Sequence, residues 1–370
     1  MKKTLALALS LLLVLALAAC GGGDSSSGAP ASTPAAADST AEPASTGDDD
    51  TPASSELNIY MWQQYISDSL IADFEAANNC KINLSYMSDN ADAITKLTAG
   101  GGQDYDLIMT CDAYMESLVA GGYVQEIDFS AIPNASNINE AYWTAKEYCV
   151  PYLMNYIYIV YNSETCPVEI TGYNDLIDPA LKGQITTIDG ARNLFPIALI
   201  ALGYDPNSTE ESEIAEAYEW LVKFNENVVS YGSTEQNLTN GTASVALTYD
   251  GNVSWAMAEL GENNTLKIAD FKEDAVQLGF DLYVIPTGAK HIDLAEKFLN
   301  YICDPEVMAK NLEEYPYSCP NDAAVAAASE SYQNDPARDF AYKENVFFQE
   351  DVGEALTIYN DYYQKLKVGG

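Results

Sequence analysis

Hydrophobic and polar positions recur with regular periods from residue 57 onward. Runs that alternate every second residue predict strands, and runs with a spacing of three to four residues predict helices. In the first part of this body the predicted strands are 57–61, 81–86 and 106–110, and the predicted helices begin at Ser67, Asn90 and Asp112. Gly100-Gly101-Gly102 and Gly121-Gly122 end two of these helices. Strands and helices therefore alternate with short connections, which favours an α/β fold with a largely parallel sheet.

The second half begins with a long apolar and aromatic run. Tyr148 to Tyr161 exceeds the usual length of one strand, so we predict two strands broken near Pro151, where the chain crosses to a second lobe. The later predicted strands are 184–188, 244–249 and 280–285, and the later predicted helices are 193–203, 211–227, one around Trp255, 293–303 and 352–366. So long a body divides naturally into two lobes. We expect lobe I at 57–155 and 284–325, and lobe II at 156–283 and 326–370.

The N-terminus has the pattern of a secretory signal. Lys2 and Lys3 precede an uncharged apolar run, which ends in Leu17-Ala18-Ala19-Cys20. The position of Cys20 resembles a bacterial lipoprotein signal, in which the thiol receives a lipid, so we expect residues 1–19 to be removed and Cys20 to anchor the chain. A plain signal peptide and a short anchor helix are the alternatives. Residues 20–56 contain Gly, Ser, Ala, Thr, Pro and acids, a composition that predicts a disordered linker.

Charge and residue usage narrow the functions of the body. The chain has 17 basic and 55 acidic side chains, a net charge of -38, which disfavours nucleic acid and anionic lipid as partners. The six cysteines other than Cys20 form no CxxC pair, which argues against a zinc or redox motif. Disulfides and buried free thiols both fit their spacing. His291 is the single histidine and lies at a predicted helix start, so no catalytic triad, metal site or cofactor is expected.

Several short segments, in order, resemble one family. Tyr60-Met61-Trp62-Gln63-Gln64-Tyr65 is similar to a Y-x-W-x-x-Y loop, and Tyr148-Cys149-Val150-Pro151-Tyr152 to an interlobe Y-x-x-P-Y. Asp104-Tyr105-Asp106-Leu107, Gly279-Phe280-Asp281 and Tyr362-Tyr363-Gln364-Lys365-Leu366-Lys367 add to the match. The body thus resembles the spermidine/putrescine-binding proteins of ABC importers. The resemblance implies a type II periplasmic-binding-protein fold, with two α/β lobes and a ligand cleft between them.

Candidate ligand contacts come from position and from the resemblance. Ligands of open α/β sheets lie beyond the carboxyl ends of strands. This criterion selects Trp62, Tyr65, Cys111, Asp112, Tyr114, Asp189, Tyr249 and Asp250. The resemblance implies contacts from Trp62, Tyr65, Asp281, Tyr317 and Gln349, with Tyr249 in place of a cleft tryptophan. Asp112 is also a good N-cap, and we expect it to cap its helix. Asp250 fits ligand contact and capping equally well.

This chain departs from the family pattern within the site itself. The family's D-D-A-R-E reads Asp189-Gly190-Ala191-Arg192-Asn193 here, which removes two carboxylates. Cys111 takes the place of a small polar residue, and Gly279 aligns near a second cleft tryptophan. Asp281 can still hold one ammonium group, with Asp189 or Asp250 as the second partner. The fold follows from the resemblance, but the identity of the ligand does not.

We therefore expect a non-enzymatic, lipid-anchored receptor at the outer face of the membrane. It would act as a monomer, close two lobes on a polyamine-like cation and deliver it to an ABC permease. A receptor of the same fold for a sugar, a metal chelate or an amino-acid derivative is the first alternative. An exported hydrolase with paired carboxylates and an adhesive lipoprotein without a small ligand are the others.

Overall fold

The computed structural model describes residues 55–88, 90–270, 274–338 and 345–369. The predicted signal peptide, Cys20 and the linker up to residue 54 lie outside these residues. Residues 53–370 form one compact unit. None of the described helices is both long and apolar enough to cross a membrane.

Strands β1 to β10 form one mixed sheet in the order β2-β1-β3-β9-β4-β7-β5-β6, with β10 beside β9 and β8 beside β4. The strands are β1 (Ser55–Met61), β2 (Cys80–Tyr86), β3 (Leu107–Cys111), β4 (Cys149–Asn162), β5 (Ile185–Thr187), β6 (Val228–Tyr231), β7 (Val245–Tyr249), β8 (Leu266–Ile268), β9 (Val276–Val284) and β10 (Val346–Phe347). Pairing is parallel within β2-β1-β3 and within β7-β5-β6, and antiparallel where β9 and β4 join these two groups.

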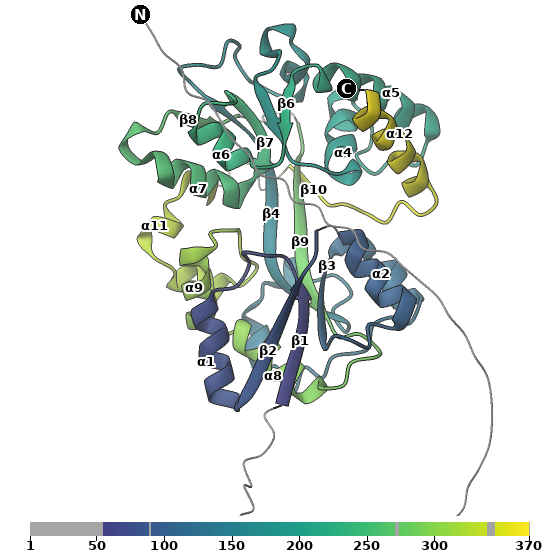
Figure 1. Ribbon diagram of the computed structural model, residues 1–370, viewed down its shortest axis with the longest axis vertical. Helices are drawn as coiled ribbons and strands as arrows, with labels where there is room; N and C mark the ends of the chain where they lie inside the picture. The colour runs from purple at the N-terminus through teal and green to yellow at the C-terminus, as the bar shows by residue number, and fades with distance from the viewer. Residues whose placement is uncertain (1–54, 89, 271–273, 339–344, 370) are drawn as a thin grey trace, which may run out of the picture. The chain divides into compact units, whose positions relative to one another are not determined.

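Helices cover both groups of strands (Figure 1). They are α1 (Asp68–Asn78), α2 (Asn90–Gly100), α3 (Met115–Ala120), α4 (Ala191–Leu202), α5 (Glu211–Asn225), α6 (Thr234–Thr239), α7 (Asp250–Leu260), α8 (Ile292–Ile302), α9 (Pro305–Glu314), α10 (Asp322–Ala327), α11 (Glu330–Gln333) and α12 (Ala355–Gly369). Short 3₁₀ helices include η1 (Asp112–Tyr114) and η7 (Pro336–Arg338). The left-handed residues Asn79 and Gly203 end α1 and α4, as expected for helix C-termini.

Two separate clusters of buried side chains form the core. One contains residues from 57–153 and 282–332, and the other contains residues from 154–280 and 337–366. We call the parts built around them lobe I and lobe II. β4 and β9 lie side by side and pass through both lobes (Figure 1). The exact lobe boundaries predicted from the sequence stay a prediction.

Three sequence predictions were wrong in detail. The run from Tyr148 to Tyr161 is one strand, β4, rather than two, although its register with β9 shifts between Pro151 and Leu153. Proline removes one ladder hydrogen bond, but the pairing with β9 resumes beyond it. The body also begins two residues earlier than expected, because Ser55 and Glu56 already pair with β2. Asp112 is the first residue of the 3₁₀ helix η1, whose N-cap is Cys111, and α3 follows it.

A buried ion pair joins segments that are distant in sequence. Asp250, at the start of α7, is fully buried and accepts a hydrogen bond from Arg338 of η7. The same Asp250 oxygen accepts hydrogen bonds from the Ser318 N–H at 2.9 Å and the Ser318 hydroxyl at 2.7 Å. Arg338 also donates to Ser254 Oγ and to the Pro316 carbonyl. This network fixes the segment at 316–318 against α7.

We predict that Arg338→Met lowers the free energy of unfolding by about 3–5 kcal/mol, since it leaves the Asp250 carboxylate buried without a cation. Denaturant unfolding at neutral pH measures this change. The double variant Asp250→Asn with Arg338→Met should recover a large part of the loss, because it removes both charges. A loss below about 1 kcal/mol for the single variant would contradict this role of the pair.

Candidate functional site

A buried polar cluster at the junction of the lobes centres on Asp281. Its side chain is 5% exposed, and its carboxylate accepts hydrogen bonds from three neutral donors. Trp62 Nε1 donates to Oδ1 at 3.1 Å, the Tyr65 hydroxyl donates to Oδ2 at 2.9 Å, and Asn155 Nδ2 also donates to Oδ2. Within the described part of the chain, no Lys, Arg or His pairs with this carboxylate.

Strands β9 and β4 and the loop after β1 position this cluster. Asp281 lies on β9, opposite Cys111 at the end of β3, and Asn155 lies on β4 opposite Gly279. Trp62 and Tyr65 follow the end of β1. The Tyr65 carbonyl accepts hydrogen bonds from the Tyr152 hydroxyl at 2.8 Å and from Asn311 Nδ2 at 3.0 Å. The loop after β1 is thus held so that its aromatic side chains meet Asp281.

The Asp281 carboxylate is buried without an opposite charge, which makes it a candidate contact for a cationic ligand. It raises the pKa of Asp281 to about 6, although the hydrogen bonds from Tyr65, Trp62 and Asn155 lower it. Neutral donors stabilise the charge but do not cancel it. A ligand ammonium at this point would supply the missing positive charge and a charge-assisted hydrogen bond.

Aromatic rings extend from the carboxylate into lobe II. The ring of Tyr317 lies 4.9 Å from that of Tyr65 and 5.6 Å from that of Trp255. Tyr317 also packs against the backbone of α7, since a β-carbon at Gly251 would lie 2.5 Å from its ring. Tyr249 packs against both cores, and its hydroxyl accepts a hydrogen bond from Asn193 Nδ2 at 3.0 Å. The faces of these aromatic rings can contact the methylene groups and the charge of an organic cation.

A sequence profile described as "Bacterial extracellular solute-binding protein" matches residues 69–340. The chain belongs to this family. A spermidine/putrescine-binding periplasmic protein of Escherichia coli K12 is 30% identical over 323 residues, which cover 85% of this chain and 92% of that protein. The predicted membership of the spermidine/putrescine-binding group, and with it a non-enzymatic protein, is confirmed.

Two solved structures confirm the predicted fold class. The substrate-binding protein PotD of Streptococcus pneumoniae superposes with a TM-score of 0.72 at 25% identity, covering 85% of this chain and 99% of that one. The Tp0655 (TpPotD) lipoprotein of Treponema pallidum also has a TM-score of 0.72, at 26% identity, covering 84% and 99%. This solute-binding protein therefore has the mixed α/β periplasmic-binding-protein fold.

Five of the predicted site residues lie in one region of the solute-binding protein. Tyr65 and Asp281 are hydrogen-bonded, Trp62 bonds to the same carboxylate, and Tyr317 packs on Tyr65. Cys111 pairs with Asp281 across β3 and β9. Burial, together with the charges of Asp112 and Asp281, raises the pKa of the Cys111 thiol, which keeps it protonated.

Three other predicted site residues have partners within the protein. Asp189 is exposed, and its carboxylate pairs with Lys367 of α12 at 3.2 Å. Asp250 pairs with Arg338, so in this structure it positions the segment that carries Tyr317. Gln349 donates from Nε2 to the Arg192 carbonyl in the first turn of α4. Direct ligand contact by these three residues stays a prediction.

Two residues were not predicted as ligand contacts but stand out in the structure. Asn155 bonds directly to Asp281, and it is the one amide in the apolar run 148–161, a signal that the sequence did contain. Asp112 was assigned to capping, but burial raises its pKa to about 7, and the charge of Asp281 contributes to this rise. The two carboxylates are therefore close enough to influence each other.

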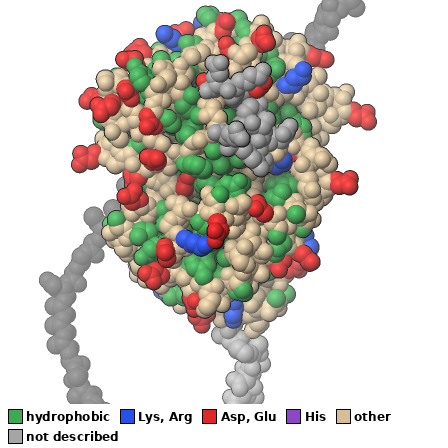
Figure 2. Space-filling view, turned by 180° about the vertical axis from the view of Figure 1, so that it is seen from behind, with side chains coloured by type: hydrophobic (Ala, Val, Ile, Leu, Met, Phe, Trp, Pro, Cys, Tyr) green, Lys and Arg blue, Asp and Glu red, His purple; other side chains and the backbone are tan. Residues whose placement is uncertain are grey.

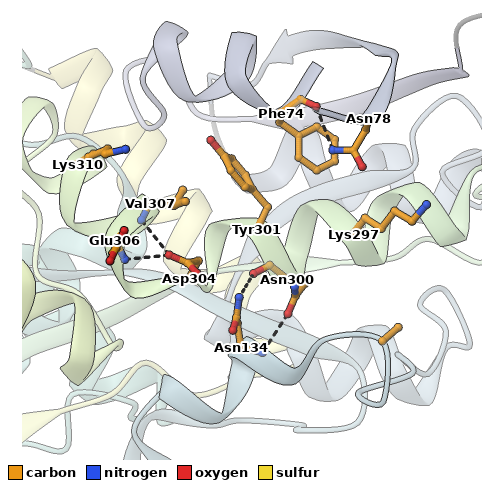
Figure 3. Close-up of a pocket in the computed structure, with 11 residues that line it drawn as sticks. Phe74, Asn78, Asn134, Lys297, Asn300, Tyr301, Asp304, Glu306, Val307 and Lys310 are labelled. Carbon is orange, nitrogen blue, oxygen red and sulfur yellow. Dashed lines mark hydrogen bonds between the residues drawn. The ribbon is translucent and has the colours of Figure 1, made fainter. Parts of the chain in front are cut away.

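The described cysteines form no disulfide, and a hollow on lobe I is lined by none of the residues of the Asp281 cluster. The six cysteines in the described residues are all free, and no group of three or more His, Cys, Asp or Glu side chains there could hold a metal ion. A wide hollow of about 520 Å³ lies on lobe I between α1, α8 and α9 (Figure 3). Its polar side chains largely bond to one another or to nearby backbone, as Asn134 does to Asn300 and Asp304 to the first turn of α9.

We predict a pH dependence of stability that comes from Asp281. Its pKa in the folded, ligand-free protein is about 6, above the usual 3.8, so its contribution to stability is present below pH 4 and is lost as the pH rises through 6. The difference in unfolding free energy between the wild type and Asp281→Asn should shift by about 1–3 kcal/mol in favour of the variant between pH 4 and pH 8. Urea unfolding at both pH values measures it. A difference that stays constant would contradict the raised pKa.

Proposed function

We propose that this solute-binding protein is the lipid-anchored receptor of an ABC importer and captures a polyamine-like cation between its two lobes. The observation that carries the proposal is the buried Asp281 carboxylate, which has three neutral donors and no described cation. An ammonium group placed there completes a charge pair in a site of low dielectric constant. The rings of Trp62, Tyr65 and Tyr317 then contact the alkyl chain next to it.

The relatives support the same solute class. The matched proteins of E. coli and S. pneumoniae carry spermidine and putrescine in their names. The face in Figure 2 presents many Asp and Glu side chains and few Lys or Arg, in keeping with the net charge of -38. A negative surface raises the local concentration of a cationic solute and so favours its association.

Capture would proceed by closure of the lobes. β4 and β9 pass through both lobes and are the natural hinge, and a ligand that contacts both lobes stabilises the closed form through its higher affinity for that form. The permease in the membrane would then receive the solute from the closed receptor. No bond is made or broken in this cycle, and no catalytic residue or cofactor takes part.

We predict that Asp281→Asn weakens binding of putrescine or spermidine by about 1.5–3 kcal/mol, the contribution of a charge-assisted hydrogen bond. Isothermal titration of the chain from Gly21 onward measures this loss. Asp293→Asn is the matched control, since it removes one exposed carboxylate from lobe I and should leave affinity unchanged. Equal affinity of the wild type and Asp281→Asn would remove Asp281 from the site. Binding of a neutral sugar, with no binding of amines, would keep the receptor and reject the cation.

The lipid anchor has a separate test. Cys20 follows Leu17-Ala18-Ala19, and the matched T. pallidum protein is described as a lipoprotein. We predict that the wild-type chain expressed in a bacterium fractionates with membranes and that Cys20→Ser is released into the soluble fraction. Metabolic labelling with a fatty acid should mark only the wild type. A labelled or membrane-bound Cys20→Ser variant would contradict lipidation at this residue.

A further inference from the structure

Gly279 lies in the middle of β9 and has open space beside it. It is not among the described glycines with a positive φ, and the register of β9 with β4 is regular from Leu153 to Tyr156, so neither a turn nor a bulge requires glycine here. A β-carbon placed on Gly279 would have no described atom within 4 Å. Glycine in a strand interior often marks a place where a ligand or another backbone comes close. Since no described backbone does so, this space indicates a ligand.

The face of β9 that Gly279 occupies is the face of the Asp281 cluster. Side chains alternate along a strand, so Gln277, Gly279 and Asp281 point to the same side of the sheet. Asn155 lies directly opposite Gly279 on β4 and donates to the Asp281 carboxylate. The open space therefore continues from Asp281 along the strand towards Gln277, beside β4 (Figure 1).

Gln277 presents a hydrogen-bond acceptor on this face. Its side chain is only 4% exposed, and its Oε1 is buried without a hydrogen-bond partner among the described residues. Nearly all buried side-chain amides in proteins are hydrogen-bonded, because an unpaired one loses its contacts with water and gains nothing in return. The N–H groups of a ligand amine can supply the missing donor, and this needs no second carboxylate.

The same face has an apolar part. Ile157 lies two residues beyond Asn155 on β4, so its side chain points to the same side of the sheet. Ile157 in turn lies opposite Tyr249 of β7. An aliphatic side chain and an aromatic ring thus stand next to the polar groups, as a ligand with both methylene and amine groups requires.

We propose that the space beside Gly279 and the Gln277 amide form a second subsite, which binds the far amine of a linear polyamine about ten atoms long. This inference rests on the proposed function, in which Asp281 binds the first ammonium group. The alkyl chain would cross Gly279, where the absence of a side chain lets it approach the strand. The far amine would donate a hydrogen bond to Gln277 Oε1.

The spacing of the two polar side chains selects the length of the ligand. Asp281 and Gln277 are four residues apart, which corresponds to roughly 13–14 Å of strand. Two nitrogen atoms, each about 3 Å from its side chain, would then lie roughly 8–14 Å apart. An extended chain gains about 3.5 Å for every three bonds. The nine bonds of spermidine therefore span about 10–11 Å and the five bonds of 1,4-diaminobutane about 6 Å, so only the longer ligand reaches both groups.

The experiment compares three ligands by isothermal titration of the chain from Gly21 onward: 1,4-diaminobutane, 1,8-diaminooctane and spermidine. The last two have the same length, and only spermidine has a middle amine. We expect both long ligands to bind the wild type about tenfold or more tightly than the short one. Gln277→Leu should remove this advantage with little change for 1,4-diaminobutane. Gln364→Leu, which alters an exposed side chain of α12, should retain it.

Thermal unfolding of the ligand-free variants separates ligand contact from a structural role. Gln277→Leu should melt at the same or a higher temperature than the wild type, because it removes a buried polar group that has no described partner. Gly279→Val should fold, since its β-carbon has space and β-branched residues suit strands, and it should weaken binding of both long ligands. Gln277→Met repeats the first test with an unbranched side chain, in case leucine is too wide.

The outcomes distinguish this inference from the proposed function. If the wild type binds amines and Gln277→Leu keeps the preference for the long ligands, the subsite is wrong while the receptor stands. A wild type that prefers 1,4-diaminobutane, or a Gly279→Val variant with unchanged affinity for the long ligands, would also overturn the subsite. A wild type that binds none of the three amines would refute the proposed function and this inference with it.

Discussion

The burial of the Asp281 carboxylate is the constraint on which the rest of the site depends. Removing an anion from water is unfavourable unless hydrogen bonds and opposite charge compensate for it. Trp62, Tyr65 and Asn155 supply the hydrogen bonds, from a loop after β1 and from β4. In the proposed receptor, the opposite charge would come from the ligand. Binding of a cation would then be favoured, because the hydrogen-bond donors are already ordered in the protein.

Other interactions in the protein hold the Asp281 cluster in place between the lobes. The ring of Tyr317 packs against that of Tyr65 because the buried ion pair of Asp250 and Arg338 fixes Ser318 and the residues just before it. Gly251 permits the close approach of the Tyr317 ring to α7. β4 and β9 carry Asn155 and Asp281 at the point where the two cores meet. In the proposed receptor, the binding site and the hinge would therefore be made from the same pair of strands.

Local patterns in the sequence predicted much of the fold and several residues of the candidate site. They failed where the partner of a residue lies far away in the sequence. Trp62 and Tyr65 could be selected because they directly follow a strand, and resemblance to a family placed Asp281 beside them. Nothing local in the sequence indicates that Asp189 pairs with Lys367, 178 residues later, or that Asp250 pairs with Arg338, 88 residues later. The prediction of a strand break at Pro151 was wrong because β9, far along the chain, continues the pairing beyond it. The sequence position of Asp112 fits a cap, but the structure places Cys111 at the N-cap of η1 and Asp112 one residue later.

The most direct test of the account is a crystal structure of the protein with a bound aliphatic diamine. The account predicts one ammonium nitrogen about 2.7–3.2 Å from the Asp281 carboxylate, with the alkyl chain against the rings of Tyr65 and Tyr317. A diamine bound elsewhere, with the Asp281 carboxylate still enclosed by its three neutral donors alone, would contradict the central claim.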